Sequence, residues 1–227
     1  MPRLAFQRAP SEYNDAFMDK MAGAYLEQTR WTRLRLSALL PLVEPRPGDR
    51  ILDLGCAAGA LTHFFSQRGA DVTGIDSEPR AIEKARSLFP DLRFEQADVA
   101  SLPQADHSVD KAVAGDLVEH LDDSTLNAML RELRRVLVPA GTLSIYTPNP
   151  KHLIERLKAH DFVLAQNPTH IGLRTADQLV AALGRNGFTV DRVGWTPSFF
   201  PVLRTLERLL GRFSQTFRYR LCIRASS

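Results

Sequence analysis

Several absences narrow what this chain of 227 residues can be. Two cysteines, Cys56 and Cys222, are too few for a disulfide framework, which favours a reducing compartment. No apolar run reaches the length of a membrane span, and the opening residues 1–6 do not resemble a targeting segment. The sequence also has no internal repeat and no low-complexity tract. With 44% hydrophobic residues the chain can bury one ordinary core, so we expect one globular unit. From the few cysteines and the lack of a targeting or membrane segment, we expect it in the cytoplasm.

Acidic residues are scarce only towards the C-terminus. The chain has a formal net charge of +3, but residues 199–227 contain six arginines and a single acid, Glu207, for a local charge of +5. The remainder therefore carries −2. A basic surface over the whole domain would be typical of nucleic-acid binding, and this distribution differs from it. We expect no DNA partner, consider RNA a disfavoured partner, and assign the basic charge to the tail alone.

Strand and helix patterns alternate from residue 50 onward. Residues 1–45 have mostly helical patterns, although Pro41 interrupts the last run, and we expect an N-terminal helical cap on a single domain over 46–227. The alternation is typical of a doubly wound, mostly parallel sheet that binds ligands at the C-terminal ends of its strands. The predicted strands cover 50–54, 72–75, 92–95, 110–114, 142–147, 188–194 and 217–223, and the predicted helices cover 59–68, 78–88, 122–137 and 175–185.

The turn after the first predicted strand indicates the kind of ligand. A pyrophosphate-binding fingerprint needs glycine at positions 55, 57 and 60, but Ala57 and Ala60 stand at the last two. Asp53, just before the turn, would repel a pyrophosphate and would suit a ligand that carries an amine. S-adenosylmethionine has a ribose, an adenine and an ammonium group and no phosphate, so it fits the turn better than a nicotinamide dinucleotide.

On these residues the chain resembles the class I S-adenosylmethionine-dependent methyltransferases, and among them the broad type 11 group of ubiquinone-biosynthesis and natural-product O-methyltransferases. The likeness covers roughly residues 30–195. The family's first motif, Asp-x-Gly-x-Gly-x-Gly, maps onto Asp53, Gly55, Ala57 and Gly59. Ala57 replaces the middle glycine, so we expect a slightly narrower site. The resemblance implies a Rossmann-like, seven-stranded sheet with helices on both faces and an antiparallel last strand, its final hairpin enlarged by an insertion.

Acids follow the next two predicted strands. Asp76 lies 23 positions after Asp53, where a carboxylate can accept both hydroxyls of a ribose; it could also cap the helix that starts near Pro79. The resemblance implies that Asp98 accepts from the adenine amino group and that Val99 lies on the ring, whereas the alternative is a solvated turn aspartate. It also places Gly115 and Asp116 at the methionine end. The predicted cofactor-binding residues are Asp53, Gly55, Cys56, Ala57, Gly59, Asp76, Ser77, Asp98, Val99, Gly115 and Asp116.

Two histidines are candidates for proton transfer. Methyl transfer from a sulfonium is an in-line displacement, and a hydroxyl acceptor must lose a proton, which a histidine can take near neutral pH. His120 follows the fourth predicted strand, but relatives carry Glu-His there without using it as a base. His170 lies in a loop before the helix predicted over 175–185, and it could be an ordinary loop histidine. We expect Tyr146, Asn149 and His152 near the same rim.

Two motifs that would identify a nucleic-acid acceptor are missing. The fourth strand is not followed by the Asp/Asn-Pro-Pro-aromatic box of enzymes that methylate DNA amino groups, and no cysteine follows the fourth or fifth strand as a nucleophile. We therefore expect O-methylation of a small-molecule, sugar or isoprenoid/lipid-type acceptor, with no metal. The alternatives are N- or C-methylation, an RNA methyltransferase, a non-catalytic cofactor-binding scaffold and, least favoured, a nicotinamide dehydrogenase.

Residues 199–213 form an amphipathic helical pattern between the last two predicted strands. Arg204, Arg208 and Arg212 recur at four-residue spacing on one face. The helix could pack on the sheet edge with a solvated basic face, or it could cover the pocket or contact anionic lipid at the inner membrane face. The opposite face carries Phe199, Val202, Leu203, Leu206, Leu209, Leu210 and Phe213.

Overall fold

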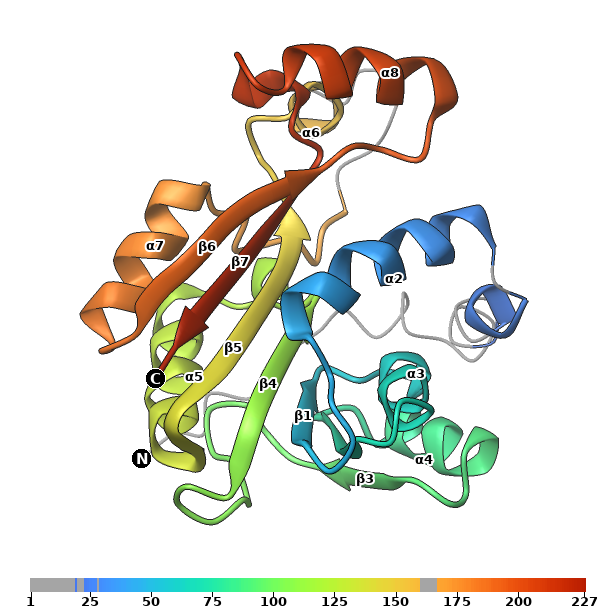
Figure 1. The fold of residues 1–227 in the computed structure, drawn as a ribbon, viewed down its shortest axis with the longest axis vertical. Coiled ribbons are helices and arrows are strands. Elements are labelled where there is room, and N and C mark those ends of the chain that lie inside the picture. The colour runs from blue at the N-terminus through green and yellow to red at the C-terminus, as the bar shows by residue number, and fades with distance from the viewer. Residues whose placement is uncertain (1–18, 20–22, 28, 160–166) are drawn as a thin grey trace.

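The computed structural model describes residues 19, 23–27, 29–159 and 167–227. Its centre is a seven-stranded sheet in the order β3-β2-β1-β4-β5-β7-β6, in which only β7 runs antiparallel to its neighbours (Figure 1). The predicted mostly parallel sheet with an antiparallel last strand is confirmed. The strands are β1 (Arg50–Leu54), β2 (Asp71–Asp76), β3 (Arg93–Gln96), β4 (Val109–Gly115), β5 (Leu137–Pro148), β6 (Thr189–Thr196) and β7 (Arg220–Ser226).

The helices begin at capping residues that the sequence supplies. Thr29 and Asp122 accept from backbone amides three residues on, and Thr175 forms a reciprocal capping box with Gln178. None of the described helices is long and apolar enough to cross a membrane. The helices are α2 (Arg30–Val43), α3 (Ala60–Ser66), α4 (Pro79–Leu88), α5 (Asp123–Val136), α6 (Leu153–Ala159), α7 (Ala176–Arg185) and α8 (Pro201–Leu210), with short 3-10 turns η1 (Val118–His120) and η2 (Gln215–Phe217).

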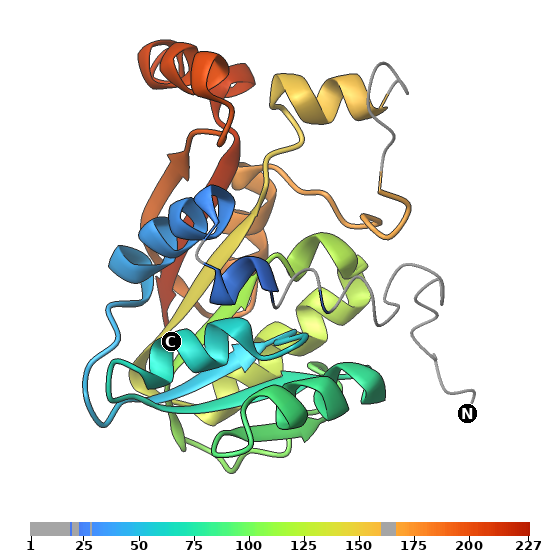
Figure 2. The same cartoon turned by 90° about the vertical axis from the view of Figure 1, so that its right-hand side faces the viewer.

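Both faces of the sheet are covered by helices. Alternate residues of a strand point to opposite faces, so Leu52 packs with α5 and α7, while its neighbour Ile51 packs with α2 and α3. Figure 2 shows α2 and α5 on opposite sides of the sheet. Core side chains that are at most 2% exposed come from both layers, among them Leu39 of α2, Phe65 of α3 and Met129 of α5. The six strands other than β7 have their C-terminal ends at the same edge of the sheet, and the ends of β1, β2, β3 and β4 carry the candidate site.

The N-terminal part differs from the expectation in one respect. Pro41 lies inside α2 instead of ending it, and the helix stops two residues later at Val43, with Glu44 in the left-handed region as C-cap. A proline removes one amide donor and restricts the preceding residue, and α2 accommodates both in its last turn. Of the cap expected over 1–45, α2 packs directly on β5 and β7. The division at residue 45 stays a prediction.

Candidate functional site

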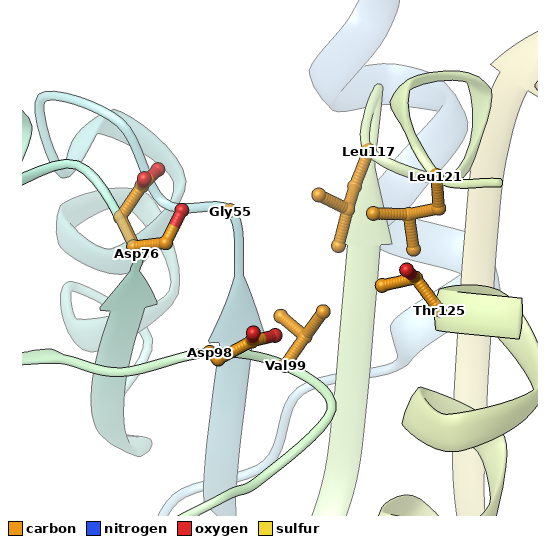
Figure 3. Close-up of a pocket in the computed structure, with 8 residues that line it drawn as sticks. Gly55, Asp76, Asp98, Val99, Leu117, Leu121 and Thr125 are labelled. Carbon is orange, nitrogen blue, oxygen red and sulfur yellow. The ribbon is translucent and has the colours of Figure 1, made fainter. Parts of the chain in front are cut away.

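A small pocket lies at the C-terminal ends of β1, β2, β3 and β4. Figure 3 shows two kinds of wall: the carboxylates of Asp76 and Asp98 on one side, and the leucines that flank η1 on the other. Five of the predicted cofactor-binding residues lie in this wall. The lining residues are Gly55, Asp76, Ser77, Asp98, Val99, Leu117, Leu121 and Thr125.

The turn between β1 and α3 adopts left-handed backbone at three positions. The φ angles are 68° at Gly55, 47° at Ala57 and 81° at Gly59, which is the N-cap of α3. A Cβ on Gly55 would lie 2.9 Å from Cδ1 of Leu117, so a larger residue would displace this leucine side chain, and the φ of 68° also favours glycine. Ala57 has a side chain in a conformation that costs an L-residue roughly 1–2 kcal/mol. The departure from the family motif is therefore a strained alanine as well as an added methyl group.

Asp76 is not the cap of α4, because the N-cap is Glu78, and the ribose role weighed for Asp76 stays a prediction. Its Oδ2 accepts from the Ala57 amide and its Oδ1 from the Glu78 amide, each at 3.0 Å, so it ties the turn to the start of α4. The residue is 3% exposed and still lines the pocket. A carboxylate has about four lone-pair directions, so Asp76 can accept several hydrogen bonds at once.

Asp98 and Val99 lie in the wall of the same pocket. Asp98 Oδ1 accepts from the Ala100 amide at 2.9 Å, which fixes the turn, and the carboxylate is otherwise exposed. Val99 is buried and presents an apolar side chain opposite Leu117 and Leu121. The wall thus combines an acceptor for an amino group with apolar contacts for a flat ring, as adenine would need.

Asp53 and Cys56 lie beneath the turn. Asp53 is 1% exposed and accepts from the Thr62 hydroxyl at 2.7 Å, and burial raises the pKa of its carboxyl to about 6 even though Thr62 opposes the shift. Burial also raises the pKa of the Cys56 thiol well above its usual value, so this cysteine is not a reactive thiolate. The contact expected between Asp53 and a ligand amine stays a prediction.

Gly115 and Asp116 are held by two arginines that the sequence patterns did not single out. Arg35 of α2 donates to the Gly115 carbonyl at 2.8 Å, and its Nε lies 2.7 Å from Asp116 Oδ2. Arg220 at the start of β7 donates to Asp116 Oδ1, also at 2.7 Å. Asp116, just after β4, therefore links α2 to β7. Partners 81 and 104 positions away leave no local pattern by which they could have been found.

Glu119, in the middle of η1, is a buried carboxyl that was also missed. It is 1% exposed and accepts from the Thr147 hydroxyl at 2.9 Å. Burial, reinforced by the negative charge of Asp116, raises the pKa of Glu119 to about 8 against the opposing effect of Arg220. The carboxyl is mostly protonated at neutral pH, so it can donate a hydrogen bond but is a poor base. In the sequence, only its position next to His120 pointed to a role for Glu119.

The structure brings His120 and His170 together. Their ring centroids are 4.9 Å apart and the rings meet edge to face at 80°. The Thr169 carbonyl lies 3.1 Å from His120 Nδ1; since a carbonyl only accepts, the proton sits on Nδ1, and Nε2 of the neutral ring is an acceptor. Burial lowers the pKa of His170, which favours its neutral form.

A tight loop contact holds this histidine pair in place. The Gly172 amide donates to the Glu119 carbonyl at 2.8 Å, and a Cβ on Gly172 would lie 2.0 Å from the Leu121 carbonyl oxygen, so only glycine permits this approach. Arg174 then donates to the carbonyls of Val118, Leu121 and Gly172. Arg174 therefore positions the loop that carries His170 against η1.

The same side chains are a possible metal-ligand set. Ligand atoms of Glu119, His120 and His170 lie within 4.8 Å of one another. A cation would have to displace the proton of Glu119, and Arg220 Nη1 already lies 3.9 Å from that carboxyl. The geometry favours a proton-handling pair over a metal centre.

Two of the residues expected at the rim are structural. His152 is 0% exposed, and Asn149 is buried and donates through its Nδ2 to the carbonyls of Gln215 and Arg218.

Comparisons with known proteins agree with this geometry. Residues 51–141 match the family described as a methyltransferase domain. Trans-aconitate 2-methyltransferase of Rhizobium meliloti (strain 1021) is 34% identical over 136 residues, which are 56% of this chain and 51% of that protein. Malonyl-[acyl-carrier protein] O-methyltransferase of Pectobacterium atrosepticum is 30% identical over 128 residues, covering 56% of this chain and 50% of that protein. The chain thus spans about half the length of the curated relatives it matches.

A solved structure extends the likeness in fold to nearly the whole chain. The crystal structure of a SAM-dependent methyltransferase from Archaeoglobus fulgidus aligns with a TM-score of 0.71 over 93% of this chain and 98% of that chain, at 18% identity. Residues 51–141 therefore match a methyltransferase domain, and the chain as a whole has the fold of that solved methyltransferase. The matches do not select the ubiquinone-biosynthesis subgroup of methyltransferases.

Proposed function

We propose that this protein transfers the methyl group of S-adenosylmethionine to an oxygen atom of a small-molecule, sugar or isoprenoid/lipid-type acceptor. When bound, the cofactor supplies an electrophilic methyl group on a sulfonium. The pocket fits such a group: Asp76 and Asp98 offer acceptors for a ribose and an amino group, and the two leucines beside η1 offer an apolar surface. Two carboxylates in the wall oppose a pyrophosphate, which argues against a nicotinamide dinucleotide.

The observation that carries the preference for oxygen is the histidine pair. A hydroxyl acceptor must lose its proton as it attacks, and a His120 ring that donates its Nδ1–H to the Thr169 carbonyl would have Nε2 as its basic nitrogen. His170 lies against the same ring and is itself kept neutral by burial. One imidazole can therefore take the proton while the other ring holds the first in its orientation. One curated relative is named as an O-methyltransferase, which is in keeping with this proposal.

The acceptor class can be tested directly. The protein is incubated with methyl-labelled S-adenosylmethionine and a cell extract, and the lipid, glycan, small-molecule and RNA fractions are counted separately. We expect label in a non-nucleic-acid fraction, in a bond with the stability of an ether or ester. Label in RNA would contradict the proposal, and tight cofactor binding with no label in any fraction would indicate a non-catalytic scaffold.

The role of the histidines needs a readout that a structural role would not change. We expect His120→Ala to lower kcat about 100-fold or more, within the usual range for a general base, and to remove the neutral limb of the pH–rate profile. His120→Asn keeps an amide donor at the position of Nδ1, towards the Thr169 carbonyl, and serves as the matched variant. Equal losses of cofactor affinity and rate with an unchanged pH profile would assign His120 to cofactor contact. The same assays on His170→Ala would show which imidazole is the base.

A further inference from the structure

The helix α8 turns its apolar side chains to solvent. Val202 is 80% exposed, Leu209 is 64% exposed and Phe213, just beyond the helix, is 87% exposed. These residues and Leu206 recur at intervals of four, three and four, so they form one stripe along the helix. Packing of this stripe on the sheet edge, the simpler expectation from the sequence, is therefore wrong: within α8 only Glu207 is buried.

A polar anchor explains why the helix has this orientation. Glu207 is 0% exposed, and its Oε1 accepts from His152 Nε2 at 2.8 Å while its Oε2 accepts from the Ser198 amide. His152 Nδ1 accepts from the Ile154 amide at 3.2 Å, which places the ring proton on Nε2, facing the carboxylate. The face of α8 that carries Glu207 is thus turned inward and is fixed to His152, just before α6, whereas the residues of the apolar stripe are exposed.

Of the arginines at 204, 208 and 212, the last two are exposed, while Arg204 is half-buried with its Nε atom buried. Glu207 is the single acid of residues 199–227, and it is committed to His152. Among the described residues no carboxylate forms an ion pair with Arg204, Arg208 or Arg212, whereas the tail arginines Arg220 and Arg224 are paired with Asp116 and Glu44. The basic charge of the tail is therefore concentrated along one flank of the exposed stripe.

We propose that α8 is an interfacial helix that docks on an anionic phospholipid surface, with the stripe Val202, Leu206, Leu209 and Phe213 in the boundary between headgroups and acyl chains. An outward apolar face beside unpaired arginines has the charge and polarity that such a surface complements. A second copy of the chain fits less well, because apposed helices would bring two rows of arginines together. The helix is only about 15 Å long, so binding is reversible and depends on both contributions.

The helix lies at the end of the sheet where the pocket opens. It is joined to the C-terminal end of β6, and α6 follows the C-terminal end of β5, so both project beyond the strand ends that carry the pocket (Figure 1). Docking through α8 would hold this end of the molecule towards the bilayer. Binding to vesicles requires neither methyl transfer nor the histidine pair, so the docking proposal and the proposed function can fail separately.

Vesicle flotation tests the proposal with charge and apolarity varied independently. The whole protein is floated with vesicles of phosphatidylcholine alone and with vesicles containing phosphatidylglycerol, at low and high salt. We expect at least tenfold more bound protein on the anionic vesicles, and a marked loss at high salt. A triple variant with Arg204, Arg208 and Arg212 changed to Glu should lose this binding. A control with the exposed Arg80, Arg131 and Arg185 changed to Glu has the same net charge and should keep it.

The apolar stripe has its own matched pair. We expect Leu209→Ser with Phe213→Ser to reduce anionic binding at least fivefold, while Ile171→Ser with Val193→Ser, which alters apolar residues 64% and 50% exposed elsewhere, leaves it unchanged. Light scattering on the same samples distinguishes self-association. No flotation by the wild-type protein, equal flotation of all variants, or a dimer that only the α8 changes dissociate would each overturn membrane docking.

Discussion

Two parts of this site are built by different physical means: the turn side, which is the turn after β1 with Asp76, and the η1 side, which contains Asp116 and Glu119. On the turn side, Asp76 accepts from the amides of Ala57 and Glu78, which lie 19 and 2 positions away. On the η1 side, Asp116 is held by Arg35 and Arg220, and Glu119 is buried beside Thr147. The first region depends on backbone shape, and the second on charges removed from water.

This difference predicts two kinds of sensitivity. A turn of left-handed residues tolerates changes in charge but not added volume, because a larger residue at Gly55 would displace the Leu117 side chain and the φ of 68° favours glycine. A buried charge network tolerates small changes in volume but not the loss of one partner, since the remaining charge would be left without compensation. The four variants below separate these cases.

The largest expected effect is on the turn. Gly55→Val places a β-branched side chain at φ 68° and within 2.9 Å of Leu117, so we expect the loss of measurable S-adenosylmethionine binding by calorimetry. Gly48→Val is the control, because Gly48 has a similar φ of 83° with no atom near its Cβ position and lies outside the pocket. If both variants bind alike, the pocket contact is irrelevant. NADH should bind neither variant nor the wild-type protein.

The charge network should respond to the loss of one arginine. Arg220→Met keeps the apolar stem but leaves Asp116 with Arg35 alone, and we expect the free energy of unfolding to fall by about 3 kcal/mol in urea titration. Arg224→Met removes a pair with Glu44, which is 51% exposed, and should cost about 1 kcal/mol or less. Equal losses for the two arginines would mean that burial of the network has no energetic consequence.

The buried carboxyl of Glu119 should make stability depend on pH. Its pKa is about 8 in the folded protein and near 4.5 when exposed, so folding favours the protonated form. This contribution is fully present below about pH 4.5 and is lost as the pH rises through 8. In Glu119→Gln it is absent, and we expect the difference in stability between the two proteins to change by at least about 1.4 kcal/mol, one pKa unit, between pH 5 and 9. Parallel curves would show an ionised Glu119.

The smallest effect concerns the strained alanine. Ala57→Gly relieves a left-handed φ of 47° but adds glycine's freedom to the unfolded chain, so the two terms nearly cancel. We expect stability to change by less than about 1 kcal/mol and cofactor affinity to rise a few-fold, as the methyl group leaves the turn. Calorimetry and thermal melts measure both quantities. Weaker binding by the glycine variant would mean that the methyl group itself contacts the cofactor.

The residues of the turn side could largely be predicted from the sequence, and the contacts of the η1 side could not. Gly55, Asp76, Asp98 and Val99 follow strand ends, and parallel strands bring their C-terminal ends to one edge, so local patterns suffice to gather them. The role of Arg220 could not be predicted from the sequence, because its partner Asp116 is 104 positions away. The periodicity of 199–213 predicted the helix α8 but not which face turns inward, since that depends on His152, 55 positions from Glu207. Long-range pairing of polar groups has no period to detect.

The order of strands at the edge of the sheet formed by β6 bears on how the chain is synthesised. Since β6 pairs only with β7, and β7 is inserted between β5 and β6, the strand made earlier has no neighbour until the later one has left the ribosome. Until then β5 has an open edge and the half-buried side chains of β6 have no sheet to join, which are the conditions under which nascent chains aggregate or recruit chaperones. Protease digestion of ribosome-bound chains stalled before and after β7 would reveal this dependence as a sharp gain of resistance.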